Sequence, residues 1–181
     1  MVNKDEMTEE NQTRETARGE RPLLFEGDID MRIARDGTWY YQGTPIKRDR
    51  LVRLFASVLM RDEAGDYFLK TPVEKARIEV EDAPFLAVEM NREGEGRDQR
   101  LTFRSNLDET VVAGPDHPLR VAQDPETGEP SPYVEIRDGL EALLTRAVYY
   151  ELAELAEPSD DDPDCLGVWS GGVFFPLGAA R

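Results

Sequence analysis

The sequence predicts an α+β fold built from two small subdomains that each combine a hairpin with a helix. Short stretches of alternating apolar and polar residues, separated by turn residues, predict β-strands along much of the chain. Only two segments, 49–59 and 138–155, carry apolar residues at the three- and four-residue spacing of a long helix. The 181 residues are enough for one ordinary domain or two small ones.

A change in character after residue 77, where strand patterns begin to dominate, suggests a boundary between two parts. The polar segment 1–21 has no apolar periodicity and predicts a disordered arm. We therefore divide the chain into this arm, an N-terminal α+β subdomain at 22–82 and a C-terminal α+β subdomain at 83–181. The hairpin and helix in each half are consistent with a duplicated unit, although no sequence repeat proves one.

The first subdomain begins with a predicted hairpin. Asp36-Gly37 separates alternating segments at 29–33 and 39–41, a pattern typical of a tight turn with two positive φ angles. Asp49 is a good N-cap for the helix that follows. The spacing predicts that the apolar face of this helix contains Leu51, Leu54, Phe55, Val58 and Leu59.

A strand at 66–69 and a second, shorter helix complete this subdomain. Thr71-Pro72-Val73-Glu74 has the form of a capping box with Pro at the first helical position, which predicts a short helix to Ala76.

The second subdomain is predicted to hold most of the strands. Pro, Gly and Asp are frequent between 113 and 132, which indicates a long surface connection. Asp138, with Glu141 three residues later, predicts the capped start of a helix that runs to Leu155. A closing hairpin is predicted around 170–172. The expected strands are 78–80, 85–90, 101–104, 110–112, 133–136, 168–169 and 173–175.

Composition excludes several classes of partner. The net charge of −16 predicts a soluble protein that repels duplex nucleic acid and anionic membranes. No apolar run is long enough to span a bilayer, and 1–21 lacks the apolar core of a signal peptide. With one Cys and one His, the chain offers neither a disulfide nor a zinc site, so we expect a cytoplasmic protein.

Motifs for catalysis or cofactor binding are missing from the sequence. There is no nucleotide-binding glycine motif, no Walker sequence and no nucleophile elbow. Asp160, Asp162 and Asp164 match the first ligands of a calcium loop, but Cys165 occupies the position that requires Gly. We therefore expect no enzyme activity, no cofactor and no metal.

A basic cluster precedes and opens the first helix. Lys47, Arg48, Arg50 and Arg53 lie within seven residues of an otherwise acidic chain, where the free N–H groups of a helix start also favour anions. They form either one wall of an anion site or a solvated face that pairs with carboxylates. We expect a small anionic ligand here, with stacking from Trp39 or Trp169 and further cations from Lys75 and Arg137. Aromatic side chains at strand positions, such as these two tryptophans, more often pack in the core or across strands than stack on a ligand.

Glu151 is an exception on the second helix. Its position in the helical repeat puts it between Leu144 and Leu155, on the apolar face. A buried carboxylate needs a cationic partner or a raised pKa. We expect Glu151 to face the interior and to pair with an Arg.

Four segments together resemble a bacterial family, the domain of unknown function 1285. They read DGTWYYQGTPIKR at 36–48, YFLKTPVEK at 67–75, VEDAPF at 80–85 and GVWS at 167–170. The order of the four motifs is more specific than any one of them, and the resemblance spans about residues 23–178.

The resemblance implies two subdomains with related motifs, the second a curved antiparallel sheet with a helix near its C-terminal end, superficially like a pleckstrin-homology fold. The family has no established activity. A nucleotide-like ligand at the domain interface and a role in signal transduction are implied only by this resemblance.

Two functional hypotheses follow. In the first, the protein is a ligand-binding or sensory protein that holds a small, nucleotide-like anion in the cleft between its subdomains. In the second, it is an interaction adaptor that docks an acidic partner on a stripe formed by Arg50, Arg53 and Arg61. A concave site with converging cations would favour the first hypothesis, and a flat exposed stripe the second.

Overall fold

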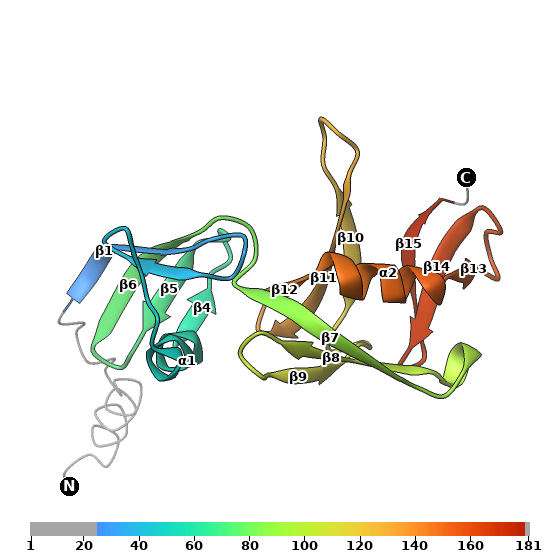
Figure 1. Cartoon of the computed structure of the whole chain (residues 1–181), viewed down its shortest axis with the longest axis horizontal. Helices are drawn as coiled ribbons and strands as arrows, with labels where there is room; N and C mark the ends of the chain where they lie inside the picture. Colours follow the sequence, from blue (N-terminus) through green and yellow to red (C-terminus); the bar gives the residue numbers. More distant parts are fainter. Residues whose placement is uncertain (1–24, 180–181) are drawn as a thin grey trace, which may run out of the picture.

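The computed structural model describes residues 25–179 and contains two halves that lie side by side along its long axis (Figure 1). The prediction for residues 1–21 lies outside this range. We call residues 25–80 the first half and residues 85–179 the second half. Residues 81–84 form the connector between them.

A six-stranded sheet and one helix form the first half. The sheet order is β3-β2-β1-β6-β5-β4, and β1 and β6 pair in parallel at its centre. Helix α1 packs on one face through Val52 and Ala56, near the buried Ile33 and Trp39. The elements are β1 (Phe25–Ile33), β2 (Trp39–Tyr41), β3 (Thr44–Pro45), α1 (Asp49–Ser57), β4 (Leu59–Arg61), β5 (Tyr67–Lys70) and β6 (Glu74–Val80).

The second half begins with another six-stranded sheet. Its order is β10-β11-β12-β7-β8-β9, with β7 and β12 parallel at the centre. The β10–β11 hairpin projects from the body of the molecule (Figure 1). The elements are β7 (Phe85–Glu93), the short 3₁₀ helix η1 (Gly96–Asp98), β8 (Arg100–Ser105), β9 (Thr110–Val112), β10 (Leu119–Gln123), β11 (Pro130–Arg137) and β12 (Leu140–Leu144).

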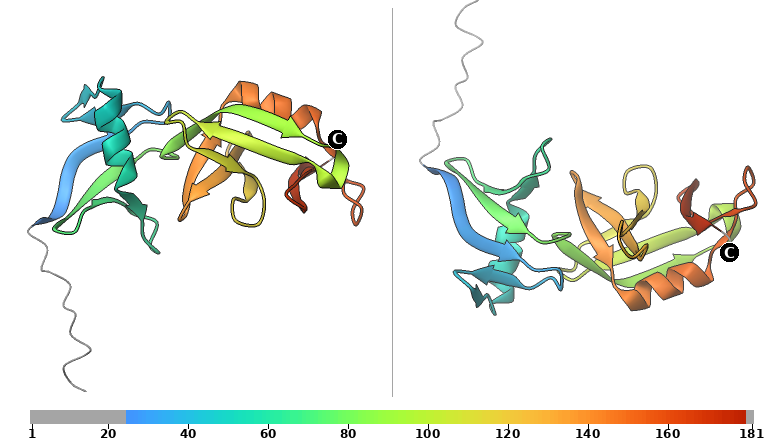
Figure 2. Two further views of the ribbon diagram at one scale, coloured as in Figure 1. Left: turned by 90° about the horizontal axis from the view of Figure 1, so that it is seen from below. Right: turned by 90° about the horizontal axis from the view of Figure 1, so that it is seen from above.

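A helix and a small sheet complete the second half. Helix α2 (Arg146–Glu154) follows β12 directly, and it lies along β7 and β12 on one face of the sheet (Figure 2). The last three strands are β13 (Glu157–Pro158), β14 (Cys165–Ser170) and β15 (Val173–Ala179), which pair in sequence order. The predicted closing hairpin is confirmed as β14 and β15, and the fold class is α+β.

The two large sheets share one strand order. In each, the first strand pairs in parallel with the sixth, the second and third extend one side, and the fifth and fourth extend the other. The helices do not follow this repeat. Helix α1 lies between the third and fourth strands, whereas α2 comes after the sixth. Each half combines a hairpin with one helix, as the sequence suggested, and the two halves also share a sheet topology.

Helix α1 is rotated relative to the predicted apolar face. Arg48 occupies the N-cap position and Asp49 is the first helical residue, without a side-chain cap bond. Leu54 is 59% exposed, while Val52 and Ala56 are buried. Leu59 is also buried, but as the first residue of β4 and not as a continuation of the helix.

The predicted short helix at 71–76 is wrong. Thr71 Oγ1 does accept a hydrogen bond from the Glu74 backbone N–H at 3.1 Å, as in a capping box. However, the Thr71 N–H donates to the Glu74 carbonyl at 2.8 Å, which closes a turn between β5 and β6. A local side-chain bond of this kind serves a hairpin as well as a helix start.

The predicted helix start at Asp138 is also wrong. Asp138 and Gly139 have φ angles of 48° and 75°, the two-residue hairpin turn that joins β11 to β12. That geometry was expected at Asp36-Gly37, where only Gly37 has a positive φ, of 81°. Apolar residues on β12 and then on α2 produced what looked like one continuous helical face.

Glu151 is exposed on α2, which corrects the prediction that it is buried and paired. The helix begins at Arg146 and turns Val148 and Leu152 toward the core. Without Leu144 in the helix, Glu151 falls on the solvent side.

The segment 113–132 is not one long connection, because it contains β10 and the turn that leads into β11. Strand β4 was not predicted. Six of the expected strands are confirmed, with ends that differ from the expected ones by up to several residues. They are β5 (expected at 66–69), β6 (78–80), β7 (85–90), β8 (101–104), β9 (110–112) and β11 (133–136). Over residues 25–179, no helix is long and apolar enough to cross a bilayer.

Candidate functional site

The basic cluster surrounds the start of α1 as the sequence indicated. Lys47, Arg48 and Arg50 are exposed, and within residues 25–179 none of them forms an ion pair. Arg53, one turn further on, reaches across to the second half. Its guanidinium donates to the Leu107 carbonyl and to Asp108 Oδ2.

The two tryptophans are not placed beside this cluster. Trp39 is 1% exposed and its ring stacks on Phe55, with 6.2 Å between ring centroids, so it is a core residue. Trp169 lies on β14, at the opposite end of the molecule from α1 (Figure 1). Its ring packs edge-on against Phe174 and beneath the Arg97 guanidinium.

The remaining predicted site residues have other partners. Lys75 lies on β6 with its ammonium 4.1 Å from the Phe68 ring centroid. Arg137 donates to the Ala56 carbonyl at 2.7 Å and to Glu109 Oε2 at 3.0 Å, which joins the end of α1 to the second half. The seven residues Trp39, Lys47, Arg48, Arg50, Lys75, Arg137 and Trp169 therefore do not converge on one cavity.

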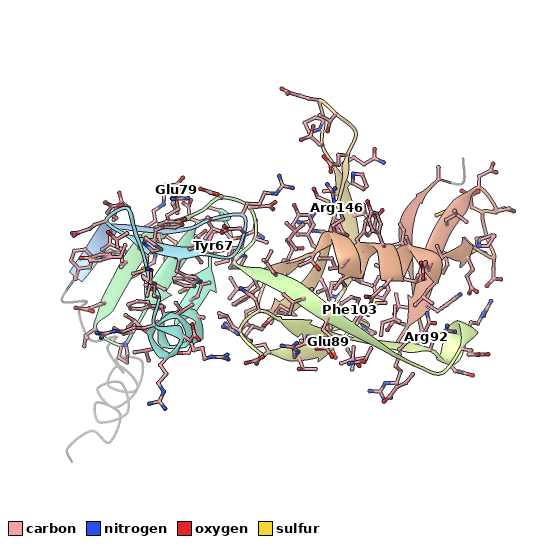
Figure 3. All side chains as sticks on the ribbon, in the orientation of Figure 1. Tyr67, Glu79, Glu89, Arg92, Phe103 and Arg146 are labelled. Atoms are coloured by element: carbon pink, nitrogen blue, oxygen red, sulfur yellow. The ribbon has the colours of Figure 1, made fainter. Side chains whose placement is uncertain are left out.

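A pocket of about 390 Å³ lies where the β1–β2 loop approaches β11 and the start of α2. We call it the interdomain pocket, because Arg35 of the first half joins residues of the second half in its walls. Arg146, at the start of α2, lies on the side of the β10–β11 hairpin (Figure 3). The lining residues are Arg35, Leu86, Glu129, Pro130, Ser131, Pro132, Leu143, Leu144, Thr145, Arg146, Tyr149 and Tyr150.

Two guanidinium groups and one carboxylate, that of Glu129, are the charged groups in the walls of the interdomain pocket. Arg35 comes from the first half and Arg146 from the second, and their side chains are 65% and 76% exposed. Arg146 pairs loosely with Glu129, at 3.7 Å. Thr145 is the N-cap of α2 but makes no side-chain cap bond, so the first N–H groups of the helix add to the positive potential.

The other walls are aromatic and aliphatic. Tyr149 and Tyr150 follow Arg146 on α2, and Tyr150 is 59% exposed. Leu86 and Leu143 come from the paired strands β7 and β12. A planar ligand can lie against such surfaces while its charged end meets the guanidinium groups.

A second, smaller pocket of about 220 Å³ adjoins the first and shares Arg35, Glu129 and Ser131 with it. We call it the side pocket. Tyr133 donates its hydroxyl to Asp82 Oδ1 at 2.7 Å. Burial, together with this hydrogen bond to a carboxylate, raises the pKa of Tyr133. The Arg120 guanidinium covers the Tyr133 ring and binds Glu141 through two nitrogens.

Arg35 and Arg146 were not among the site residues predicted from the sequence. Arg35 directly precedes the Asp36-Gly37 turn, which places it at the tip of the first hairpin. Arg146 was assigned to a helix interior because the helix was started at Asp138, whereas it is the first residue of α2. A helix start placed at Thr145 would have indicated that Arg146 lies in the first turn of the helix, where an anion can bind.

The other main pockets of the described residues have at most one cation each in their walls. An apolar groove of about 460 Å³ beside α1 is lined mainly by residues such as Phe25, Tyr41 and Phe55. Between residues 25 and 179, no three His, Cys, Asp or Glu side chains are arranged to hold a metal ion. Asp160 instead pairs with Arg97.

Comparison with known proteins identifies the family of the chain. The family models for the N-terminal and C-terminal domains of the domain of unknown function 1285 match residues 22–83 and 84–177. No curated protein matches this chain.

Two solved structures are similar over most of the chain. A protein of this family from Silicibacter pomeroyi is 54% identical, with a TM-score of 0.82, over 87% of this chain and 84% of the other. A second, from Shewanella baltica, is 30% identical, with a TM-score of 0.54, over 70% of this chain and 91% of the other. With both of its domains matched in order, the chain belongs to the family of the domain of unknown function 1285.

Proposed function

We propose that this protein is a non-enzymatic sensory protein that binds a small, nucleotide-like anion in the interdomain pocket. One observation carries the proposal: two arginines from different halves, Arg35 and Arg146, line the same pocket beside two tyrosines. A ligand bound there contacts both halves, so its binding can affect the whole molecule.

The chemistry of the pocket suits a phosphate group joined to a planar group. Guanidinium binds phosphate through paired N–H donors, and Ser131 and the start of α2 add further donors. Tyr149 and Tyr150, with the aliphatic wall, suit a base or another flat ring.

The charge of the rest of the molecule supports a small ligand over a polymer. A chain with a net charge of −16 repels polyanions as a whole, while a local pair of arginines still attracts a compact anion. The proposal includes neither a cofactor nor a catalytic step. It places the protein in the cytoplasm, because the lone Cys165 needs no oxidising environment.

The test begins with a thermal-shift screen of nucleotides and other phosphorylated metabolites, since a ligand that prefers the native state raises stability. Binding of the best hit is then measured by calorimetry for Arg35→Gln and Arg146→Gln. Each charge-assisted contact contributes about 1.5–3 kcal/mol, so each variant is expected to bind about tenfold more weakly or worse. Folding should change little, because both side chains are largely exposed.

The double variant Lys47→Ala/Arg48→Ala is the matched control. It removes two positive charges from the α1 cluster, which does not line the interdomain pocket. We expect it to bind normally. If it loses binding while Arg35→Gln and Arg146→Gln retain it, the site is at the start of α1, as the sequence analysis expected.

A second candidate function is an adaptor for an acidic protein partner. It is favoured by the exposure of Lys47, Arg48 and Arg50 without ion pairs within the described residues. The basic stripe predicted for such an adaptor is reduced in the structure. Arg53 binds Asp108 and Arg61 lies over the Tyr67 ring, so neither is as free to meet a partner as Arg50. No hit in the ligand screen, together with salt-sensitive binding of an acidic peptide that Arg50→Gln abolishes, would support it.

A further inference from the structure

Among residues 25–179, Arg35 is the one cation that lines both the interdomain pocket and the side pocket. In the side pocket, its Nε lies 3.2 Å from Asp82 Oδ2. We propose that this Arg35–Asp82 pair is a latch that an anion in the interdomain pocket must open or weaken. The proposal rests on the proposed function, and it identifies Asp82 as a group of the protein itself that competes with the bound anion for Arg35.

The position of Arg35 allows it to serve either partner. It belongs to the loop after β1, its side chain is 65% exposed, and its Nη2 lies 3.5 Å from Ser131 Oγ on β11. An exposed guanidinium can change rotamer at little cost. Two anions beside it weaken each other's binding, because their like charges repel and they compete for the same N–H donors.

Asp82 is more confined than Arg35. Its side chain is 16% exposed, and it lies in the connector between the halves. Oδ1 accepts the Tyr133 hydroxyl at 2.7 Å, while Oδ2 faces Arg35. A carboxylate so placed stays where it is when Arg35 moves, and the tyrosine hydroxyl then remains as its hydrogen-bond donor.

The latch connects ligand binding to the joint between the halves. The same loop is also attached to the connector through Glu81, which accepts the Arg35 backbone N–H at 2.9 Å and pairs with Arg32. If the anion weakens the Arg35–Asp82 contact, the contact weakens anion binding by the same factor. Occupancy of the pocket therefore loosens one of the ties between the loop and the connector.

Two substitutions are expected to change affinity in opposite directions. Asp82→Asn removes the competing charge at nearly constant volume, so the full chain should bind pyrophosphate about two- to fivefold more tightly, the range expected of one exposed ion pair. Tyr133→Phe removes the other donor to Asp82, which makes that carboxylate more dependent on Arg35. This variant should bind pyrophosphate more weakly than the native chain. A purely structural disturbance would shift both variants the same way.

Asp124→Asn is the control for general electrostatics. Asp124 also lines the side pocket, but its Oδ1 accepts turn N–H groups of Glu126 and Thr127, and it forms no ion pair with Arg35. All four proteins are titrated with pyrophosphate by calorimetry. A smaller gain for Asp124→Asn than for Asp82→Asn supports the latch.

Three results would overturn the latch, and they separate it from the proposed function. Equal gains for Asp82→Asn and Asp124→Asn would mean simple charge repulsion. Binding by the native chain with no change in Asp82→Asn would refute the latch alone. If neither the native chain nor Asp82→Asn binds pyrophosphate, the pocket is not an anion site and both proposals fail.

Discussion

At the scale of single residues, Gly37 allows the two halves to approach each other closely. Gly37 has a φ of 81°, and a Cβ at this position would lie 2.9 Å from Asn106 Nδ2 and 3.2 Å from Leu86 Cδ1 in the second half. Asn106 in turn accepts the Leu86 backbone N–H through its side chain at 3.0 Å. The tip of the first hairpin therefore rests on the second half through a residue that has no side chain.

We expect Gly37→Ala to lower the free energy of unfolding by about 1–3 kcal/mol, through backbone strain together with overpacking. Gly43→Ala is the control, because Gly43 has a φ of 72° but no atom within 4 Å of its would-be Cβ. Urea unfolding of both variants separates the two causes. Equal losses would show that the contact with Asn106 and Leu86 contributes nothing.

At the scale of elements, α2 anchors the second half through a narrow buried stripe. Val148 is 2% exposed and Leu152 is fully buried, while Glu151 between them faces solvent. The helix lies on β7 and β12, the parallel pair at the centre of the sheet. Loss of packing under the helix should therefore lower the stability of the whole second half.

Leu152→Ala is expected to cost about 2–5 kcal/mol, because it leaves a cavity beneath α2. Glu151→Ala, one residue earlier, should stay within about ±0.5 kcal/mol, as a solvent-facing change does. Denaturant midpoints of the two variants provide the measurement. A large loss for Glu151→Ala would restore the view that this carboxylate is buried and paired.

Arg137 gives a second prediction at this scale, because it connects α1 to the second half. Its side chain is 29% exposed, and it donates to the Ala56 carbonyl as well as to Glu109. Arg137→Met removes hydrogen bonds to partners that are themselves partly buried and should cost about 1–3 kcal/mol. Arg77→Met, which breaks an exposed pair with Asp66, should cost less than about 1 kcal/mol. Similar losses in urea unfolding would rule out a special role for Arg137.

At the scale of the whole molecule, the halves are joined by both apolar and ionic contacts. Their buried apolar residues form one continuous core cluster. At the surface, Arg53 of α1 and Arg104 of β8 both hold Asp108, and Arg104 also holds Glu89. These hydrogen bonds, first of all the one from Arg53, lower the pKa of Asp108, and Arg104 lowers the pKa of Glu89.

The lowered pKa of Asp108 predicts how acid affects the joint. As the pH falls, Asp108 is protonated in the unfolded chain first, near the ordinary Asp pKa of about 3.9. The contribution of the Arg53–Asp108 pair to the free energy of unfolding is therefore complete above that pH. It is lost as the pH falls through the lowered value. The stability difference between the native chain and Arg53→Met should therefore shrink below about pH 4. Urea unfolding from pH 6 to pH 3 provides the test, and a constant difference would contradict it.

The sequence by itself determined the class of fold and most of the strands. Alternating, aromatic and β-branched stretches located β1, β2, β5, β7, β8 and β11, because such residues suit a half-buried pleated surface. Composition set the acidic character of the chain, and family-like motifs identified its relatives. These properties depend on local spacing or on simple sums, which no tertiary contact can alter.

Tertiary structure decided the points at which local signals were ambiguous. Thr71–Glu74 and Asp138–Glu141 have the spacing of helix caps, yet both segments turn between strands, because sheet pairing outweighs a single cap bond. The candidate site depends on the same decision. Arg35 and Arg146 are 111 positions apart in the sequence, and only the docking of the first hairpin against β11 and the start of α2 brings them to one pocket. Convergence of this kind is a property of packing between elements, and local spacing in the sequence carries no record of it.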